Sequence, residues 1–137
     1  MMQGGCFCGA IRYQADDLPF HETNCHCSIC RHTSGAPFVA WFSVPKARFR
    51  ILAGEPTRFR SSRQATRSFC SSCGTPLTFE HDDFPEEVDV TICSLDNPEA
   101  VLPKDHIWTS SRLTWIKLTD GLPSYRERRP EDEDSQD

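Results

Sequence analysis

The sequence predicts an all-β domain of short antiparallel strands with one or two short helical turns. Ten prolines and seven glycines favour turns, and stretches with helical periodicity are few. Short runs rich in β-branched and aromatic residues recur at roughly 8–12-residue spacing, which is typical of all-β domains. The apolar content of 37% over 137 residues is modest. Metal sites or cross-links would therefore help to stabilise the single domain that we expect.

The elements follow in order from local composition. Residues 36–44 form the most apolar run and are expected to be a central strand. Residues 28–34 fit one or two helical turns ended by Gly35, and Pro45 begins a single turn over 45–48. The strand at 76–80 is expected to form a hairpin with the strand before it. The expected strands are 11–13, 20–24, 36–44, 49–52, 57–61, 67–70, 76–80 and 88–94, followed by short extended pieces at 106–108 and 115–118.

The acidic charge is concentrated at the C-terminus. The net charge is -5, and without the five terminal acidic residues the remaining 15 equal the 15 basic ones. We therefore predict a domain over residues 1–125 and an acidic disordered tail over 126–137. A neutral body without a basic block argues against nucleic-acid binding. The five acidic residues are Glu131, Asp132, Glu133, Asp134 and Asp137.

The sequence contains no apolar run of membrane-spanning length, and its first residues lack the pattern of a signal peptide. We therefore predict a cytoplasmic protein without a membrane partner. Thiols stay reduced in the cytosol, so clustered cysteines there indicate metal or redox chemistry before disulfides.

Eight cysteines fall into four groups along the chain. Residues 6–9 form a C-x-C-G turn and residues 70–74 a C-x2-C-G turn, in which both sulfurs face one point and the glycine supplies positive φ. Each pair offers two ligands, so together they make one tetrahedral set. We interpret this set as a closed structural zinc site made of Cys6, Cys8, Cys70 and Cys73.

Cys25, Cys27 and Cys30 remain, in the spacing C-x-C-x2-C. Three thiolates are one ligand short of a closed site, and an open position distinguishes catalytic from structural zinc. Two residues could supply the missing ligand, namely Cys93 and His32. His26 lies between two converging ligands, so we expect its ring to point away. The prediction is two Zn²⁺ ions per chain, the second of them catalytic.

Four arginines form a local basic run whose meaning the sequence leaves open. The favoured interpretation is a solvated strand face. The other is that some of these side chains offset the thiolate-rich sites or bind a carboxylate of the substrate. The four are Arg58, Arg60, Arg63 and Arg67.

The chain resembles the glutathione-dependent formaldehyde-activating enzyme family, which also contains centromere protein V. The resemblance covers the chain to about Tyr125 and rests on the cysteine motifs at 5–9, 25–31 and 69–74 and on the segments 94–96 and 106–108. It implies a tent-like set of antiparallel sheets around zinc. It also implies the same ligand assignment: structural zinc at the two pairs and catalytic zinc at the triplet.

The resemblance implies a carbon–sulfur lyase acting on a thiol adduct of an aldehyde, such as S-hydroxymethylglutathione. Zinc held by three thiolates is a weak Lewis acid that accepts sulfur readily, so we expect the sulfur of glutathione or another small thiol to bind the open position. By their chemistry alone, His106 and His32 are candidates for the general acid. The alternatives are a non-catalytic zinc-stabilised binding module for a protein partner, and a triplet that buffers or passes zinc. The sequence leaves the aldehyde and the oligomeric state open.

Overall fold

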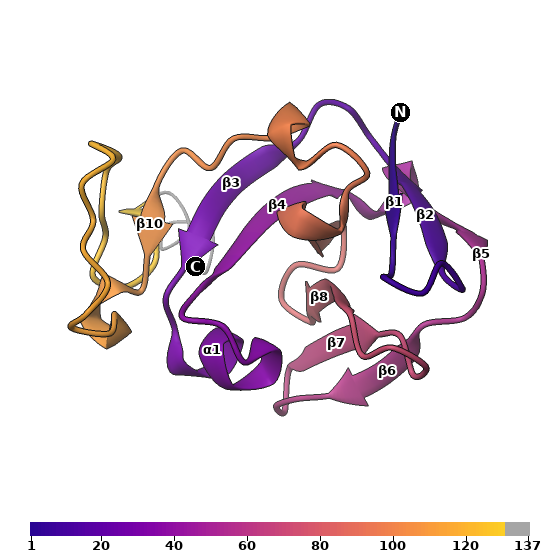
Figure 1. The fold of residues 1–137 in the computed structure, drawn as a ribbon, viewed down its shortest axis with the longest axis horizontal. Coiled ribbons are helices and arrows are strands. Elements are labelled where there is room, and N and C mark those ends of the chain that lie inside the picture. Colours follow the sequence, from indigo (N-terminus) through magenta and orange to yellow (C-terminus); the bar gives the residue numbers. More distant parts are fainter. Residues whose placement is uncertain (131–137) are drawn as a thin grey trace. The chain divides into compact units, whose positions relative to one another are not determined.

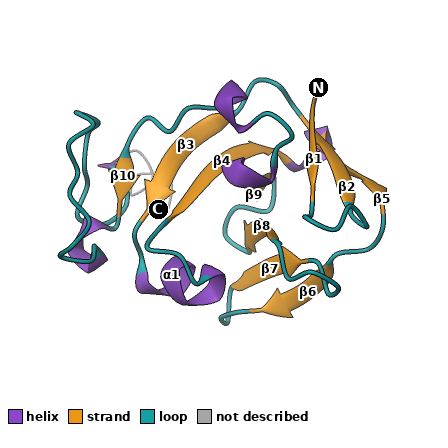
Figure 2. Cartoon of the chain, viewed as in Figure 1, coloured by secondary structure: helices purple, strands orange, loops and turns teal. Residues whose placement is uncertain are grey.

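The structure is a computed structural model that describes residues 1–130. It is mostly β, as the sequence predicts (Figure 2). The chain forms two compact units, which are described separately. One comprises Met1–Phe20 and Phe42–Leu102, and the other comprises His21–Trp41 and Pro103–Asp137. No helix among the described residues is long and apolar enough to cross a membrane.

The first unit contains a three-stranded antiparallel sheet in the order β1-β2-β5. The close approach of its strands depends on Gly4. A Cβ atom there would lie 2.5 Å from the hydroxyl of Tyr13, which is completely buried and bonds to Ser94 at 2.7 Å. The three strands are β1 (Met2–Gly5), β2 (Arg12–Ala15) and β5 (Phe49–Ala53).

The same unit contains four antiparallel strands that are neighbours in the order β9-β8-β7-β6. Figure 1 shows β6, β7 and β8 side by side. β7 and β8 form the predicted hairpin, and alternate residues of β9, Val88 and Val90, are buried with Leu77 of β8. The four strands are β6 (Thr57–Arg60), β7 (Ala65–Phe69), β8 (Pro76–His81) and β9 (Glu87–Thr91).

Short 3-10 turns complete the first unit. They are η1 (Lys46–Arg48), which follows β4 (Val39–Pro45) as expected, η2 (Ile92–Ser94) and η3 (Pro98–Ala100). The chain passes from the second unit to the first within β4.

The second unit pairs two strands in parallel. β10 (His106–Ile107) lies beside β3 (Phe20–Cys25), with Ile107 opposite Cys25. The described part of this unit also contains the helical elements α1 (Ser28–Ser34) and η4 (Thr109–Ser111). Gly35 ends α1 at φ 71°, as the sequence predicts.

The segment 123–127 lies along β10 and the residues that follow it. The N–H of His106 donates to Pro123, and the N–H of Trp108 donates to Glu127. Arg129 is buried and donates to Asp105 at 2.5 Å. The predicted tail thus includes residues 126–130, which the structure describes, and residues 131–137, which lie outside the described part.

Three local predictions differ from the structure. Residues 2–5 form β1 although two glycines lower their β-propensity, because pairing with β2 supplies the hydrogen bonds. The strand expected over 88–94 ends at Thr91 and continues as η2. The extended piece expected at 115–118 is absent. The N–H of Ile116 donates back to Leu113, and Trp115 is exposed.

Candidate metal centres

Two glycine turns bring four cysteines together in the first unit. The N–H of Gly9 donates to the carbonyl of Cys6 at 3.1 Å, and the N–H of Gly74 donates to that of Cys70 at 2.7 Å. Both glycines have φ 81°, a conformation that L side chains rarely adopt. The two turns also touch each other, because the hydroxyl of Thr75 accepts from the Phe7 N–H at 3.1 Å.

The four sulfurs are spaced as the corners of a zinc tetrahedron. All lie within 4.8 Å of one another in the set Cys6, Cys8, Cys70 and Cys73. Cys8 Sγ is 3.6 Å from Cys6 Sγ and 3.7 Å from Cys70 Sγ. A tetrahedron with Zn–S bonds of about 2.3 Å has edges of about 3.8 Å. The set therefore fits a tetrahedral metal ion.

Hydrogen bonds act unequally on these thiols. The hydroxyl of Thr75, 3.2 Å from Cys73 Sγ, and the Thr75 N–H lower the pKa of Cys73 to about 5. The Ala10 N–H lowers the pKa of Cys8, but contact with Cys6 and other thiols outweighs it and raises that pKa to about 11. A cation between the sulfurs would favour the thiolate form of all four.

Three further cysteines converge in the second unit, and local structure is enough to bring them together. Cys25 ends β3, and Cys27 precedes α1, where its Sγ accepts from the Cys30 N–H at 3.2 Å. Cys30 Sγ lies 3.5 Å from Cys25 Sγ, and all three sulfurs lie within 4.8 Å of one another.

Among residues 1–130 no further His, Cys, Asp or Glu joins this three-cysteine set. Cys93 is exposed on η2, and His32 is exposed on α1. The ring of His26 is turned toward His106, in keeping with the expectation that it points away from the sulfurs. The donor count of the two sets therefore differs by one.

The chemistry of the donors fits a thiophilic cation in both sets. Contact with Cys27 and Cys30, followed by burial, raises the pKa of the Cys25 thiol far above its usual range. Thiols crowded in this way resist ionisation unless a cation lies between them. Thiolates select zinc and other soft or borderline metals. All eight cysteines are free, so both sets are available as ligands.

A chain of hydrogen bonds begins at His26, which lies between Cys25 and Cys27 in the sequence. His26 Nε2 lies 2.9 Å from His106 Nδ1, and His106 Nε2 lies 2.7 Å from Asp120 Oδ2. Burial is the main cause that lowers the pKa of His26 to about 4, and a positive charge on His106 or Arg112 would act in the same direction. The bond from His106 also lowers the pKa of Asp120.

Two residues of these sites, Thr75 and Asp120, were not predicted from the sequence. Thr75 binds both turns of the four-cysteine set, and its only signal is that it follows the glycine of the second turn. Asp120 precedes Gly121, which reads as an ordinary turn. His106, predicted as a general acid, has both ring nitrogens hydrogen-bonded and is buried.

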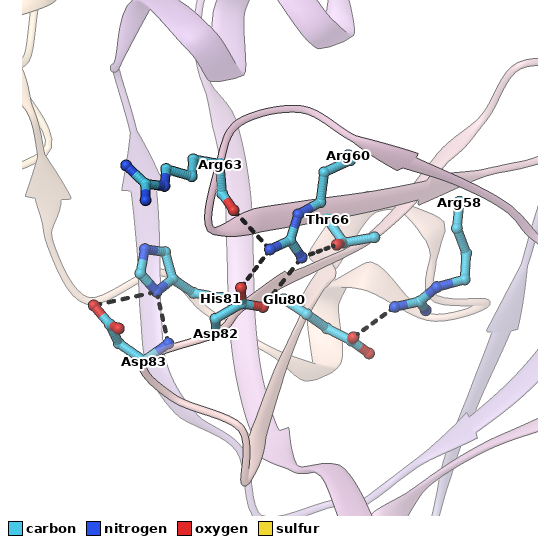
Figure 3. Close-up of polar contacts among 8 residues, drawn as sticks. All are labelled: Arg58, Arg60, Arg63, Thr66, Glu80, His81, Asp82 and Asp83. Atoms are coloured by element: carbon cyan, nitrogen blue, oxygen red, sulfur yellow. Dashed lines mark hydrogen bonds and ion pairs between the residues drawn. The ribbon is translucent and has the colours of Figure 1, made fainter.

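Two members of the arginine run pair with acidic residues at the end of β8 and just after it (Figure 3). Arg58 donates to Glu80 at 2.9 Å, and Arg60 donates to Asp82. All four side chains belong to the first unit, beside a surface pocket of about 400 Å³. Arg58 and Arg60 are exposed and paired with acidic side chains, as expected for a solvated strand face. Arg67 is half-buried, with its guanidinium carbon 4.9 Å from the centre of the Phe79 ring.

Comparison with known proteins decides the family. The sequence model of the glutathione-dependent formaldehyde-activating enzyme matches residues 1–111. The chain belongs to this family. A Halomonas elongata protein that provisionally carries the same enzyme name is 27% identical over 131 residues, which cover 86% of this chain and 81% of that protein.

One further relative and one solved structure extend the comparison. An uncharacterized lyase of Schizosaccharomyces pombe is 34% identical over 80 residues, 58% of this chain and 57% of that protein. The crystal structure of a Rhodobacter sphaeroides protein has a TM-score of 0.60 at 23% identity, covering 90% of this chain and 99% of that one. This last likeness supports the fold alone.

Proposed function

We propose that this family member is a carbon–sulfur lyase that acts on the adduct of an aldehyde with glutathione or another small thiol. The proposal rests on the donor count. One cysteine set supplies four thiolates, and the other supplies three with no further His, Cys, Asp or Glu among residues 1–130. Family membership supports the reaction class, since relatives are named as a formaldehyde-activating enzyme and a lyase.

In this proposal each set holds Zn²⁺. Cys6, Cys8, Cys70 and Cys73 close a structural site, whereas Cys25, Cys27 and Cys30 leave one position for a substrate. When bound there, the metal supplies a sulfur-binding Lewis acid that lowers the pKa of a thiol. The eight free cysteines suit the reducing cytoplasm, where we place the protein.

The proposed reaction balances without an oxidant or reductant. In the adduct, the carbon carries both the thioether sulfur and a hydroxyl group. The C–S bond breaks with its electron pair going to sulfur, and the hydroxyl proton passes through a base to that sulfur, which leaves as the thiol. The carbon–oxygen bond becomes the carbonyl of the free aldehyde. In the reverse direction the thiol adds to the aldehyde.

The chain's own residues have separate tasks in this scheme. The backbone of β3 and α1 holds the three sulfurs within 4.8 Å of one another. His106 is buried and both its ring nitrogens bond to other side chains, His26 and Asp120, which argues against direct contact with a substrate. His32 is exposed on α1 and remains the candidate for the proton transfer that the hydroxyl requires.

The experiment is a metal count followed by a glutathione titration. We expect two zinc ions in the wild type and one in each of Cys27→Ser and Cys70→Ser. Glutathione should give a saturable binding isotherm with the wild type and none with Cys27→Ser. Cys93→Ser is the matched control, because Cys93 belongs to neither set, and it should behave as wild type. Equal glutathione binding by Cys27→Ser and the wild type would falsify the assignment of the thiol site.

A further inference from the structure

We propose that Asp120 and His106 are positioning residues for the three-cysteine set, acting through the ring of His26. Neither residue is a ligand in the proposed metal site. Their role would be to fix the backbone from which the sulfurs of Cys25 and Cys27 project. The inference rests on the proposed function only in requiring that the three cysteines hold a metal.

The hydrogen bonds run in one defined direction. An ionised carboxylate only accepts, so His106 Nε2 donates its proton to Asp120 across 2.7 Å. With one proton on each ring, His106 Nδ1 must then accept from His26 Nε2 across 2.9 Å. Asp120 thereby selects the tautomer of both histidines.

His26 is closely packed, but only one of its two ring nitrogens has a hydrogen-bond partner among the described residues. Its side chain is 1% exposed, its ring lies 4.7 Å from that of Phe38, and its backbone N–H donates to Ile107 at 3.0 Å. Nδ1 of His26 is buried without a hydrogen-bond partner among the described residues. An unpaired buried acceptor destabilises the folded state. The bond from Nε2 to His106 is therefore the polar contact that orients the ring.

The ring and the two sulfurs are linked by backbone geometry. In an extended chain successive side chains point to opposite sides, so Cys25 and Cys27 share the side that His26 does not. β3 ends at Cys25, and Cys27 has the extended angles φ -65° and ψ 151°. Holding the ring on one side therefore fixes both thiols on the other.

Asp120 is itself fixed by the turn that contains it. Its Oδ1 accepts from the Leu122 N–H at 3.1 Å, and the residues after this turn pair with β10. Asp120 also lies beyond residues 1–111, the part matched by the family model. The polar chain thus joins the C-terminal segment of this protein to the backbone between two cysteines.

The test is competition for zinc in the full-length, zinc-loaded protein with a chromophoric chelator. Loss of a group that orients metal ligands typically weakens metal binding about 10–100-fold. Because Asp120 acts through two rings, we expect Asp120→Ala to lower the zinc affinity of the three-cysteine set about tenfold. Asp120→Asn keeps an acceptor oxygen and should have a smaller effect. Zinc should pass to the chelator in two steps in the wild type. The step that is absent in Cys27→Ser belongs to the three-cysteine set.

The four-cysteine set is the internal reference and should not change. Asp82→Ala is the matched control, since Asp82 is 55% exposed and paired with Arg60, while Asp120 is 47% exposed and paired with His106. An unchanged affinity in Asp120→Ala overturns the proposal. So does an equal loss at both sets, which would mark a general loss of stability.

The tautomers give a second readout that a purely structural role would not move. Nitrogen NMR of the zinc-loaded protein should show the protons of His26 and His106 on Nε2. In Asp120→Ala both rings should lose that single tautomer. A proton on Nδ1 of His26 in the wild type contradicts the proposed direction.

A glutathione titration of the wild type separates the two proposals. If the wild type does not bind glutathione but Asp120→Ala still weakens zinc binding, the positioning role is supported and the lyase assignment fails. If glutathione binds and Asp120→Ala changes nothing, the positioning role alone fails. A wild type that holds zinc only in the four-cysteine set overturns both.

Discussion

The two cysteine sets differ in how the chain assembles them. The four-cysteine set joins turns that lie 62 residues apart, from Cys8 to Cys70. The three-cysteine set comes from the end of β3 and the first turn of α1. A metal in the first set closes a long loop, whereas a metal in the second fixes only a local turn. The first should therefore stabilise the fold, while the second is free to serve chemistry.

The largest expected effect is on stability after loss of the four-cysteine set. Cys70→Ser should lower the free energy of unfolding by more than about 4 kcal/mol, because a metal that closes a long loop is lost. Cys27→Ser should lower it by less than about 2 kcal/mol. Thermal and denaturant unfolding measure both. Similar losses in the two variants would mean that the three-cysteine set is also structural.

A smaller effect should come from the buried ion pair of the second unit. Arg129 donates to Asp105, and both side chains are buried. Arg129→Met leaves the carboxylate of Asp105 without its ion-pair partner, and we expect a loss of about 3 kcal/mol. Urea unfolding would measure this loss, with release of zinc from the three-cysteine set as the signal.

The matched control for this variant is Arg58→Met. Arg58 pairs with Glu80 in the first unit and is exposed, so its loss should be below about 1 kcal/mol. Equal losses in the two variants would contradict the view that the second unit depends on its C-terminal segment.

Alkaline pH should weaken the first unit through Tyr13. Burial raises the pKa of Tyr13 from 10.0 to about 12, against a smaller lowering by Ser94. Between pH 10 and 12 the unfolded state loses the phenol proton while the folded state keeps it. Stability should therefore fall as pH rises, by at most about 2–3 kcal/mol.

The variant Tyr13→Phe removes this titration, whereas Tyr125→Phe leaves Tyr13 in place and is the control. Unfolding measured at several alkaline pH values should show a shallower decline only in Tyr13→Phe. A decline of the same slope in all three proteins would show that Tyr13 is not its source.

The smallest expected effect is at the arginines of β6. Because Arg60 pairs with Asp82 on the surface, Arg60→Ala should change stability by less than about 1 kcal/mol and leave glutathione affinity unchanged. Calorimetric titration with glutathione measures the second quantity. A clear loss of affinity would revive the interpretation that these arginines bind a substrate carboxylate.

The sequence predicted the β strands and the individual cysteine turns because both depend on local signals, whereas the grouping of the two distant turns into one set came from counting ligands. Turn glycines and the C-x-C and C-x2-C spacings are visible without tertiary structure, and α1 with its end at Gly35 follows the same logic. The strand β1 was missed because its pairing with β2, not its composition, determines it.

The role of His106 could not be predicted from the sequence, because it depends on polar contacts between residues that are distant in the chain. His106 looked like a general acid because histidine chemistry permits that role. Its partners His26 and Asp120 lie 80 and 14 residues away, and only the fold brings them together. The parallel pairing of β10 with β3, which sets that geometry, has no hairpin signal in the sequence.

The most direct test of the central claim uses the selenol analogue of glutathione and X-ray absorption at the selenium edge. If the three-cysteine set binds zinc and accepts the thiol, selenium should have one zinc neighbour in the wild type and in Cys93→Ser. It should have none in Cys27→Ser. A wild-type protein with two bound zinc ions and no zinc neighbour at selenium would contradict the account.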